Sequence, residues 1–266
     1  MIKTFLYPFK FLYKYNSILI QTSLNDIRGR FAGSALGLAW VFLYPILFLG
    51  AYSTVYLFIF KIKFPDLGSF EYILFIFSGL LPFIGFTEAL GTGTPSVISN
   101  SNLIKNTLFP IDLIPVKASL TTQVTSVVGI LLLTIILLFM GKLSWYFFLL
   151  FPTWILQMMF TTGVIWILSG LNVFFRDLQN IVGLLTFILM MVSPIAYRTD
   201  MVPENLQPLL RLNPLYYMIT SYQHIFIFKK MPPTEVVVIF IALCFFTFLV
   251  GFYFFQKIKE VLIDNV

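Results

Sequence analysis

The sequence predicts an all-α protein embedded in a membrane, and three observations support that class. The first is composition: 59% of the 266 residues are hydrophobic and 11% are charged, whereas a soluble domain carries about 25% charged residues. The second is a mean hydropathy of +0.94. The third is the spacing of the charges, which leaves apolar blocks long enough to cross about 30 Å of hydrocarbon. Because lipid offers the backbone no hydrogen-bond partner, we expect these blocks to be helices.

Six charge-poor blocks predict six transmembrane helices within a single transmembrane domain, residues 1–266. Pro45 and Pro82 fall inside the first two blocks and are expected to bend them, because proline removes a backbone donor. Glu88 interrupts the second block, so it pairs with a basic residue, faces a cavity, or lies beyond the end of the span. The expected spans are residues 31–60, 70–92, 117–140, 145–171, 178–197 and 234–256.

Six spans place both termini on one side of the membrane. If that side is cytoplasmic, it holds ten of the 17 basic residues and the opposite side holds seven. Five of the ten precede the first span, where the positive-inside rule weighs most, so we expect cytoplasmic termini. The net charge of +6 then reflects basic flanks and not a nucleic-acid partner. The five are Lys3, Lys10, Lys14, Arg28 and Arg30.

Three segments outside the spans have patterns of their own. Residues 1–30 place lysines on one side of a helical wheel and aromatic residues on the other, which predicts an interfacial helix and linker, or a basic flank with no further role. Residues 97–114 predict a short cytoplasmic coupling helix, either a docking surface for a soluble partner or an interfacial connector. Residues 198–230 contain prolines and too few apolar residues to span, so two short re-entrant helices, broken near Asn213–Pro214, are expected.

An adjacent charge pair, Arg176–Asp177, stands between the fourth and fifth blocks. With cytoplasmic termini, this pair lies in a cytoplasmic elbow, where charges reach water. Any short loop needs polar residues, so the pair serves either the turn alone or also a partner.

The sequence excludes several kinds of catalytic site. No stretch matches G-x-x-x-x-G-K-[ST], so the chain has no phosphate-binding loop of its own. His224 is the single histidine and Cys244 the single cysteine, which removes histidine- and cysteine-based metal sites and triads. We therefore expect no catalytic residue, no metal and no cofactor on this chain. A membrane enzyme acting on lipid-linked sugars and a secondary transporter remain as rival classes, but clustered acids and mid-membrane charges are lacking.

Aromatic residues recur at every fourth position of the first block. Residues four apart are neighbours on a helix surface, so their rings form a rail along the span. Aromatic faces stack on the C–H faces of sugar rings, which would suit the path of a polymer; alternatively, the rings pack against lipid or mark the interfaces. The proposed path residues are Trp40, Tyr44, Phe48, Tyr52 and Tyr56, followed by Phe60.

Four stretches in the right order resemble the membrane subunit of bacterial polysaccharide exporters of the ABC-2 type. "RFAGSALGLAW" resembles the family pattern that opens the first span, and "NLIKNTLFPIDLIPV" its segment between spans two and three. "LNVFFRDLQNIV" resembles its most recognisable loop, and "SPIAY", "MVPE" and "LNPL" its outer re-entrant region. The sequence departs from the family at Tyr222–Gln223 and at Ala32 and Gly33, which bears on the identity of the polymer.

The resemblance implies a multi-pass protein of the bacterial cytoplasmic (inner) membrane. A second copy of the chain would complete a homodimeric channel, driven by two copies of a separate ABC ATPase that binds ATP and Mg. The implied substrate is a lipid-linked polysaccharide, first of all O-antigen on undecaprenyl pyrophosphate; teichoic acid, capsule or small lipophilic substrates are alternatives. The expected ATPase contacts are Asn102, Leu103, Lys105, Phe109, Arg176 and Asp177, and the expected outer contacts with lipid phosphate are Arg198 and Arg211.

Overall fold

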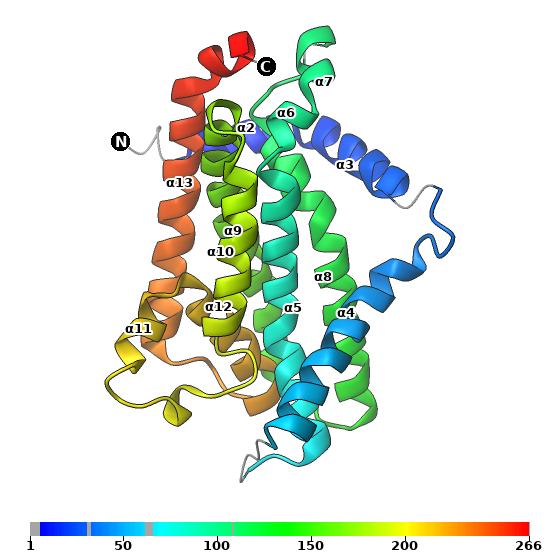
Figure 1. Cartoon of the computed structure of the whole chain (residues 1–266), viewed down its shortest axis with the longest axis vertical. Helices are drawn as coiled ribbons and strands as arrows, with labels where there is room; N and C mark the ends of the chain where they lie inside the picture. The colour runs from blue at the N-terminus through cyan, green and yellow to red at the C-terminus, as the bar shows by residue number, and fades with distance from the viewer. Residues whose placement is uncertain (1–5, 31–32, 62–65, 108, 266) are drawn as a thin grey trace.

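The computed structural model describes residues 6–30, 33–61, 66–107 and 109–265, and every regular element in these ranges is a helix (Figure 1). The all-helical class predicted from the sequence is therefore confirmed for the described part of the chain. Lys3, Phe31, Ala32 and Lys63 lie outside the described residues.

Five helices in the described ranges are long and apolar enough to cross a membrane. A sixth apolar helix, α10, spans Leu178–Val192 and has 15 residues, about 22 Å at 1.5 Å per residue. It ends before residue 197 because Ser193 is extended and Pro194 follows it. The five are α4 (Ala39–Ser53) continued by η1 (Thr54–Ile59), α5 (Ser69–Gly93), α8 (Leu113–Phe139), η2 (Trp145–Leu149) continued by α9 (Leu150–Phe174), and α13 (Thr234–Asn265).

The remaining elements are short and lie at the two ends of the bundle. Near the termini are α2 (Tyr7–Lys14), α3 (Asn16–Arg30), α6 (Ser96–Ser99) and α7 (Ser101–Asn106). At the other end are η3 (Thr199–Met201), α11 (Gln207–Leu212), α12 (Pro214–Gln223) and η4 (His224–Phe228). Figure 1 shows that α2 and α3 lie across the bundle at the end that also carries the C-terminus.

The central helix is α5, most of whose residues are buried. It packs against α8, α9, α12 and α4, while α13 packs mainly against α9. Buried side chains donate hydrogen bonds to the backbone of α5: Gln123 to the carbonyl oxygen of Gly85 (3.3 Å) and Gln157 to that of Pro82 (3.2 Å). Such bonds between helices satisfy polar groups that lipid would leave without partners.

Small residues let α9 and α13 meet backbone to backbone. A Cβ atom added to Gly251 would overlap the backbone oxygen of Gly163, and one added to Gly163 would overlap the backbone of Thr247. Close approach of this kind is typical of transmembrane helix pairs, because association in lipid depends on van der Waals contact.

Several element boundaries differ from those expected. The first span begins at Ala39 and not at residue 31, because Gly33 and Gly37 have positive φ angles of 81° and 49°, which interrupt a helix. The coupling segment 97–114 is two short helices and an irregular stretch, and α8 begins at Leu113. The last helix continues to Asn265 instead of ending at 256, since polar residues outside the membrane still support a helix.

Candidate functional site

The rings along the first span form a continuous ladder from Tyr44 to Phe60. Consecutive ring centroids are 5.4, 6.4, 5.5 and 5.6 Å apart, within the range of favourable aromatic contacts. The planes of Tyr52 and Tyr56 are 14° apart and therefore stacked. Tyr56 lies in the π-helical turn η1. Trp40 is 40% exposed at the first turn of α4.

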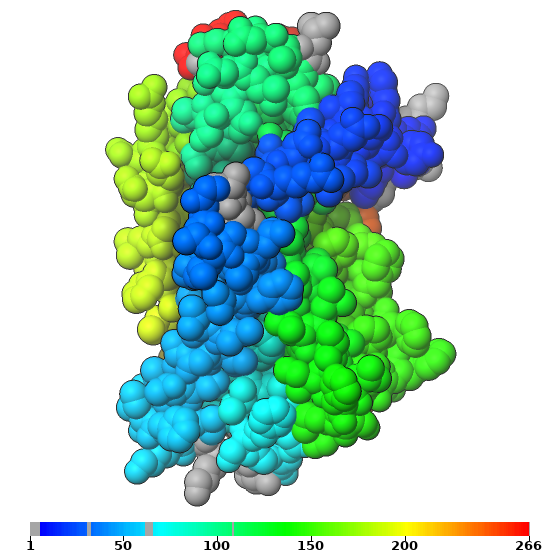
Figure 2. All heavy atoms as spheres, turned by 90° about the vertical axis from the view of Figure 1, so that its right-hand side faces the viewer, coloured from blue at the N-terminus to red at the C-terminus, as the bar shows by residue number. Residues whose placement is uncertain are grey.

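The ladder contacts α10 at Tyr52. The hydroxyl of Tyr52 donates to the carbonyl oxygen of Met190 on α10, at 3.4 Å. Figure 2 shows α4 covering α5 on this face, between α10 at one edge and α8 at the other. Phe48, Tyr52 and Tyr56 are half-buried, so one edge of each of these rings packs against the bundle and another remains accessible.

The predicted coupling residues lie at the end that carries the termini (Figure 1). Asn102 and Lys105 on α7 are exposed, while Leu103 and Phe109 are half-buried. Arg176 and Asp177 are exposed in the elbow between α9 and α10. The exposed members of the two groups thus face solvent at one end of the molecule.

A buried lysine ties the coupling segment to the helix that precedes the first span. The ammonium nitrogen of Lys117 lies 2.8 Å from a carboxylate oxygen of Asp26 on α3 and donates to Asn100 Oδ1 at 3.2 Å. Asn100 joins α6 to α7, and the Lys117 side chain is 7% exposed. No sequence pattern singles out these residues, because only their meeting in space distinguishes them from ordinary polar residues.

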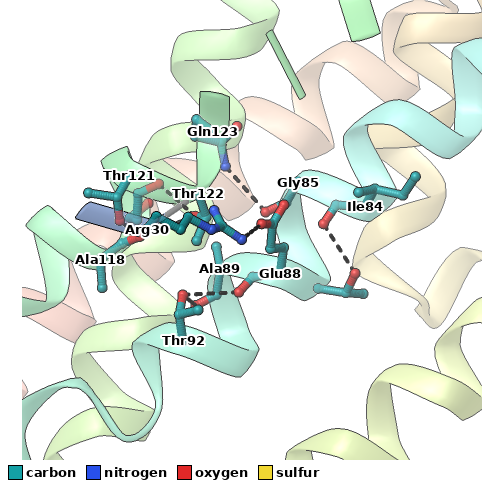
Figure 3. A network of polar contacts seen from close by, with 12 residues as sticks. Arg30, Ile84, Gly85, Glu88, Ala89, Thr92, Ala118, Thr121, Thr122 and Gln123 are labelled. Atoms are coloured by element: carbon teal, nitrogen blue, oxygen red, sulfur yellow. Dashed lines mark hydrogen bonds and ion pairs between the residues drawn. The ribbon is translucent and has the colours of Figure 1, made fainter. Parts of the chain in front are cut away.

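A second link joins the end of α3 to the middle of the bundle. Arg30 forms an ion pair with Glu88 on α5, and Figure 3 shows Arg30 reaching between α8 and α5 to that carboxylate. Glu88 lies inside α5, so the helix does not end before it, and of the alternatives open at the sequence level, pairing with a basic residue is correct.

Asp112 adds a third polar contact at this end. Gln256 on α13 donates to its carboxylate at 2.9 Å, and Trp166 on α9 donates to its backbone oxygen at 2.9 Å. Burial raises the pKa of the Asp112 carboxyl above its ordinary value. The start of α8, the middle of α9 and the C-terminal part of α13 therefore meet where the coupling segment ends.

The two arginines predicted at the outer face do not form one common site. Arg198 forms ion pairs with Asp200 (2.8 Å) and Asp66 (3.6 Å), and it lines a cavity beside α12. Arg211 lies on α11 and pairs with Glu235 at 3.4 Å. Each guanidinium therefore has its own carboxylate partner, and the two belong to separate elements.

The described residues contain no group of three or more histidine, cysteine or acidic side chains that could hold a metal ion. Cys244 is buried within α13, and burial of this kind leaves a thiol unreactive.

Comparison with known proteins assigns the family. A family model described as ABC-2 type transporter matches residues 23–227. The O-antigen export system permease protein RfbA of Myxococcus xanthus is 30% identical over 227 residues, 84% of this chain and 85% of that protein. Its counterpart of the same name in Klebsiella pneumoniae is 29% identical over 254 residues, 92% of this chain and 95% of that protein. The polysialic acid transport protein KpsM of Escherichia coli is 27% identical over 198 residues, 74% of this chain and 76% of that protein.

The family model covers the first-span ladder, the coupling segment, the elbow and the outer helices α11 and α12 together. The resemblance drawn from four short motifs is thus confirmed over most of the chain. The chain belongs to the ABC-2 type transporter family and is a multi-pass membrane permease.

Proposed function

We propose that the chain is the channel-forming membrane subunit of an ATP-driven exporter of lipid-linked polysaccharide in the bacterial cytoplasmic membrane. The substrate class is O-antigen on undecaprenyl pyrophosphate or a closely related surface polymer. Relatives named as O-antigen export permeases support this class. A relative named for polysialic acid transport favours a capsular polymer as the second candidate.

The observation that carries the proposal is the aromatic ladder along α4 and η1. Its rings contact one another from Tyr44 to Phe60, and three of them carry hydroxyl groups. The Tyr52 hydroxyl bonds to Met190. For Tyr44 and Tyr56, a hydroxyl within a span is costly against lipid, so a water-lined path accounts for these two tyrosines better than a lipid-facing surface does. Ring faces with hydroxyl edges suit a chain of sugar rings.

The proposal includes a second copy of the chain and two ATPase subunits. The chain has six spans with cytoplasmic termini, α10 being the short fifth span, while α11, α12 and η4 re-enter the outer leaflet. Two copies line the path with their ladders. The ATPase docks on Asn102, Leu103, Lys105, Phe109, Arg176 and Asp177 and supplies the ATP and Mg. Arg211 meets the phosphates of outer lipids or of the emerging carrier, since a guanidinium group binds phosphate bidentately. Arg198, which was expected to share this role, is held by the carboxylates of Asp66 and Asp200.

The ladder is tested by replacing Tyr44, Phe48 and Tyr52 together with alanine. Loss of about 0.5 kcal/mol of stacking for each ring amounts to about a tenfold fall in export rate. Surface polysaccharide is quantified in cells whose own copy of the gene is deleted. The matched control replaces Phe42, Ile46 and Leu47, which lie on the same helix, are exposed, and are not members of the ladder. Equal export by both triple variants would mean that the ladder only packs.

A further inference from the structure

A cavity of about 450 Å³ opens at the end of the bundle opposite the termini. It lies between the segment that follows α10 and the continuous stretch formed by α12 and η4. Its volume falls within the range of small-ligand sites, about 300–1,000 Å³. Every residue that lines it is among the described residues.

Aromatic rings form part of the cavity wall. Tyr197, Tyr216, His224 and Phe228 all line it. The rings of His224 and Phe228 are 5.1 Å apart, and the guanidinium carbon of Arg198 lies 5.6 Å from the Phe228 ring centroid. Ring faces and a stacked guanidinium offer flat apolar surfaces beside charged edges.

The charges around the cavity are close to balanced. The guanidinium of Arg198 is opposed by the carboxylates of Asp200 and Asp66, and Lys230 adds one further positive charge at the cavity rim. A phosphate would have to compete with two carboxylates for Arg198. An uncharged ligand avoids that competition.

The polar atoms of the cavity include both acceptors and donors. Nδ1 of His224 lies 2.9 Å from the carbonyl oxygen of Thr220; since a carbonyl only accepts, Nδ1 carries the hydrogen and Nε2 is left as an acceptor. Burial lowers the pKa of His224, which keeps the imidazole neutral. The Asp200 carboxylate can accept hydrogen bonds, and the Lys230 ammonium group can donate them. The side-chain nitrogen Nε2 of Gln223 donates to the carbonyl oxygens of Pro194 (2.9 Å) and Ile195 (3.2 Å). These bonds hold α12 against the segment that follows α10.

We infer that this outer cavity is a binding subsite for an uncharged saccharide unit of the exported polymer. Ring faces stack on the C–H face of the sugar, while Asp200, Nε2 of His224 and Lys230 bind its hydroxyl groups. The inference rests on the proposed function and adds to it a defined sugar subsite beyond the aromatic ladder.

His224 makes the inference directly testable, because it is the only histidine in the chain. In the complete transporter, purified in detergent without a histidine tag and with an unlabelled ATPase, ¹³C-labelled histidine gives one ring signal from each permease subunit. The probe is a set of oligosaccharides released by mild acid from the surface polysaccharide of the cells that carry the chain. We expect a saturable shift of the His224 signal with these oligosaccharides and no saturable shift with inorganic pyrophosphate.

Two carboxylate variants supply a matched comparison. Asp200→Asn removes a carboxylate that lines the cavity and should weaken saccharide binding about tenfold. Asp66→Asn removes the other partner of Arg198, which does not line this cavity, and should change binding less than about twofold. Failure of the saccharides to shift the signal, a saturable shift with pyrophosphate, or equal weakening by both variants would overturn the inference.

The proposed function is tested separately by deleting the gene. If the deleted cells still display the polysaccharide, the proposed function fails and the inference fails with it. If the polysaccharide disappears but its fragments leave the His224 signal unchanged, the inference alone fails.

Discussion

The ammonium group of Lys117 is buried between residues that lie far away in sequence. It contacts Asp26 on α3 and Asn100 between α6 and α7, while Arg30 at the end of α3 pairs with Glu88 on α5. The helix α3 is therefore held at two points, one beside the coupling segment and one beside the central span. Movement of the coupling segment would be passed to α3, which immediately precedes the first span.

Replacement of Lys117 by alanine should destabilise the protein by about 1–3 kcal/mol, because Asn100 loses its buried donor and Asp26 its partner. Asp26 is 47% exposed and can be rehydrated, which keeps the loss below that of a fully buried pair. The apparent midpoint of thermal unfolding in detergent measures the effect.

Lys142→Ala is the control for this change, since Lys142 pairs with Glu71 at a site where both side chains are about one-third exposed. Such a pair contributes about 0–1 kcal/mol. Equal falls in the unfolding midpoint for the two variants would contradict the importance of burial at Lys117.

At the scale of elements, α9 and α13 are in close backbone contact. Gly163 and Gly251 allow the two backbones to touch, and Trp166 packs beside them against Phe248 and Phe252, with ring centroids 5.2 Å apart in each pair. Through α9, this helix pair packs against α5.

Gly251→Ala should lower the stability by about 1–3 kcal/mol, because the added methyl group overlaps the backbone of Gly163 and forces the helices apart. Gly183→Ala on α10 is the matched control: nothing lies within 4 Å of a Cβ atom there, so no loss is expected. Unfolding midpoints that fall equally in both variants would point to a general intolerance of alanine and against close packing.

The proposed re-entrant arrangement places both ends of the segment from α11 to η4 on the outer face of the membrane. Leu206 and Lys230, which flank α11 and η4, are exposed, and re-entrant helices leave both positions on the outer face. Cysteines at these positions should each react with a membrane-impermeant thiol reagent in intact cells. The native Cys244 is buried and gives little background.

Lys105→Cys serves as the internal reference for labelling, because it should react only after the cells are permeabilised. If either outer cysteine behaved like position 105, that end of the segment would be cytoplasmic and the re-entrant arrangement would be wrong.

At the scale of the whole molecule, the coupling segment, α2 and α3 and the C-terminus share one end, and α11 and α12 lie at the other (Figure 1). The ATPase of the proposed transporter docks at one of these ends. The end with Lys105 and the Lys117 contacts connects a solvent-facing surface to α3 and α5, so we place the ATPase there.

A cysteine at Lys105 should form a disulfide with a cysteine on the neighbouring ATPase surface in the assembled transporter, because α7 exposes this position. Non-reducing electrophoresis detects the product. Lys230→Cys, at the opposite end, is the negative control. An intact complex that yields no crosslink from position 105 would refute the docking surface.

The sequence by itself determined the membrane class, the approximate positions of the long helices and the family. Hydrophobic length and charge spacing act locally along the chain, and Asn213–Pro214 likewise ends one helix and begins the next, as expected from proline geometry. The every-fourth spacing of aromatic residues also foretold the ring contacts on α4, because helix geometry alone brings such residues together.

Only the tertiary structure decided which polar residues meet. The partner of Glu88 is 58 residues away in sequence. Lys117 joins α3, which precedes α4 and α5 in the chain, to Asn100, which follows them. Nor could the sequence show that Arg198 is balanced by two carboxylates beside an aromatic cavity. Such contacts depend on how helices of similar composition pack, and in lipid that packing is set by shape and by a few buried hydrogen bonds, which no local pattern records.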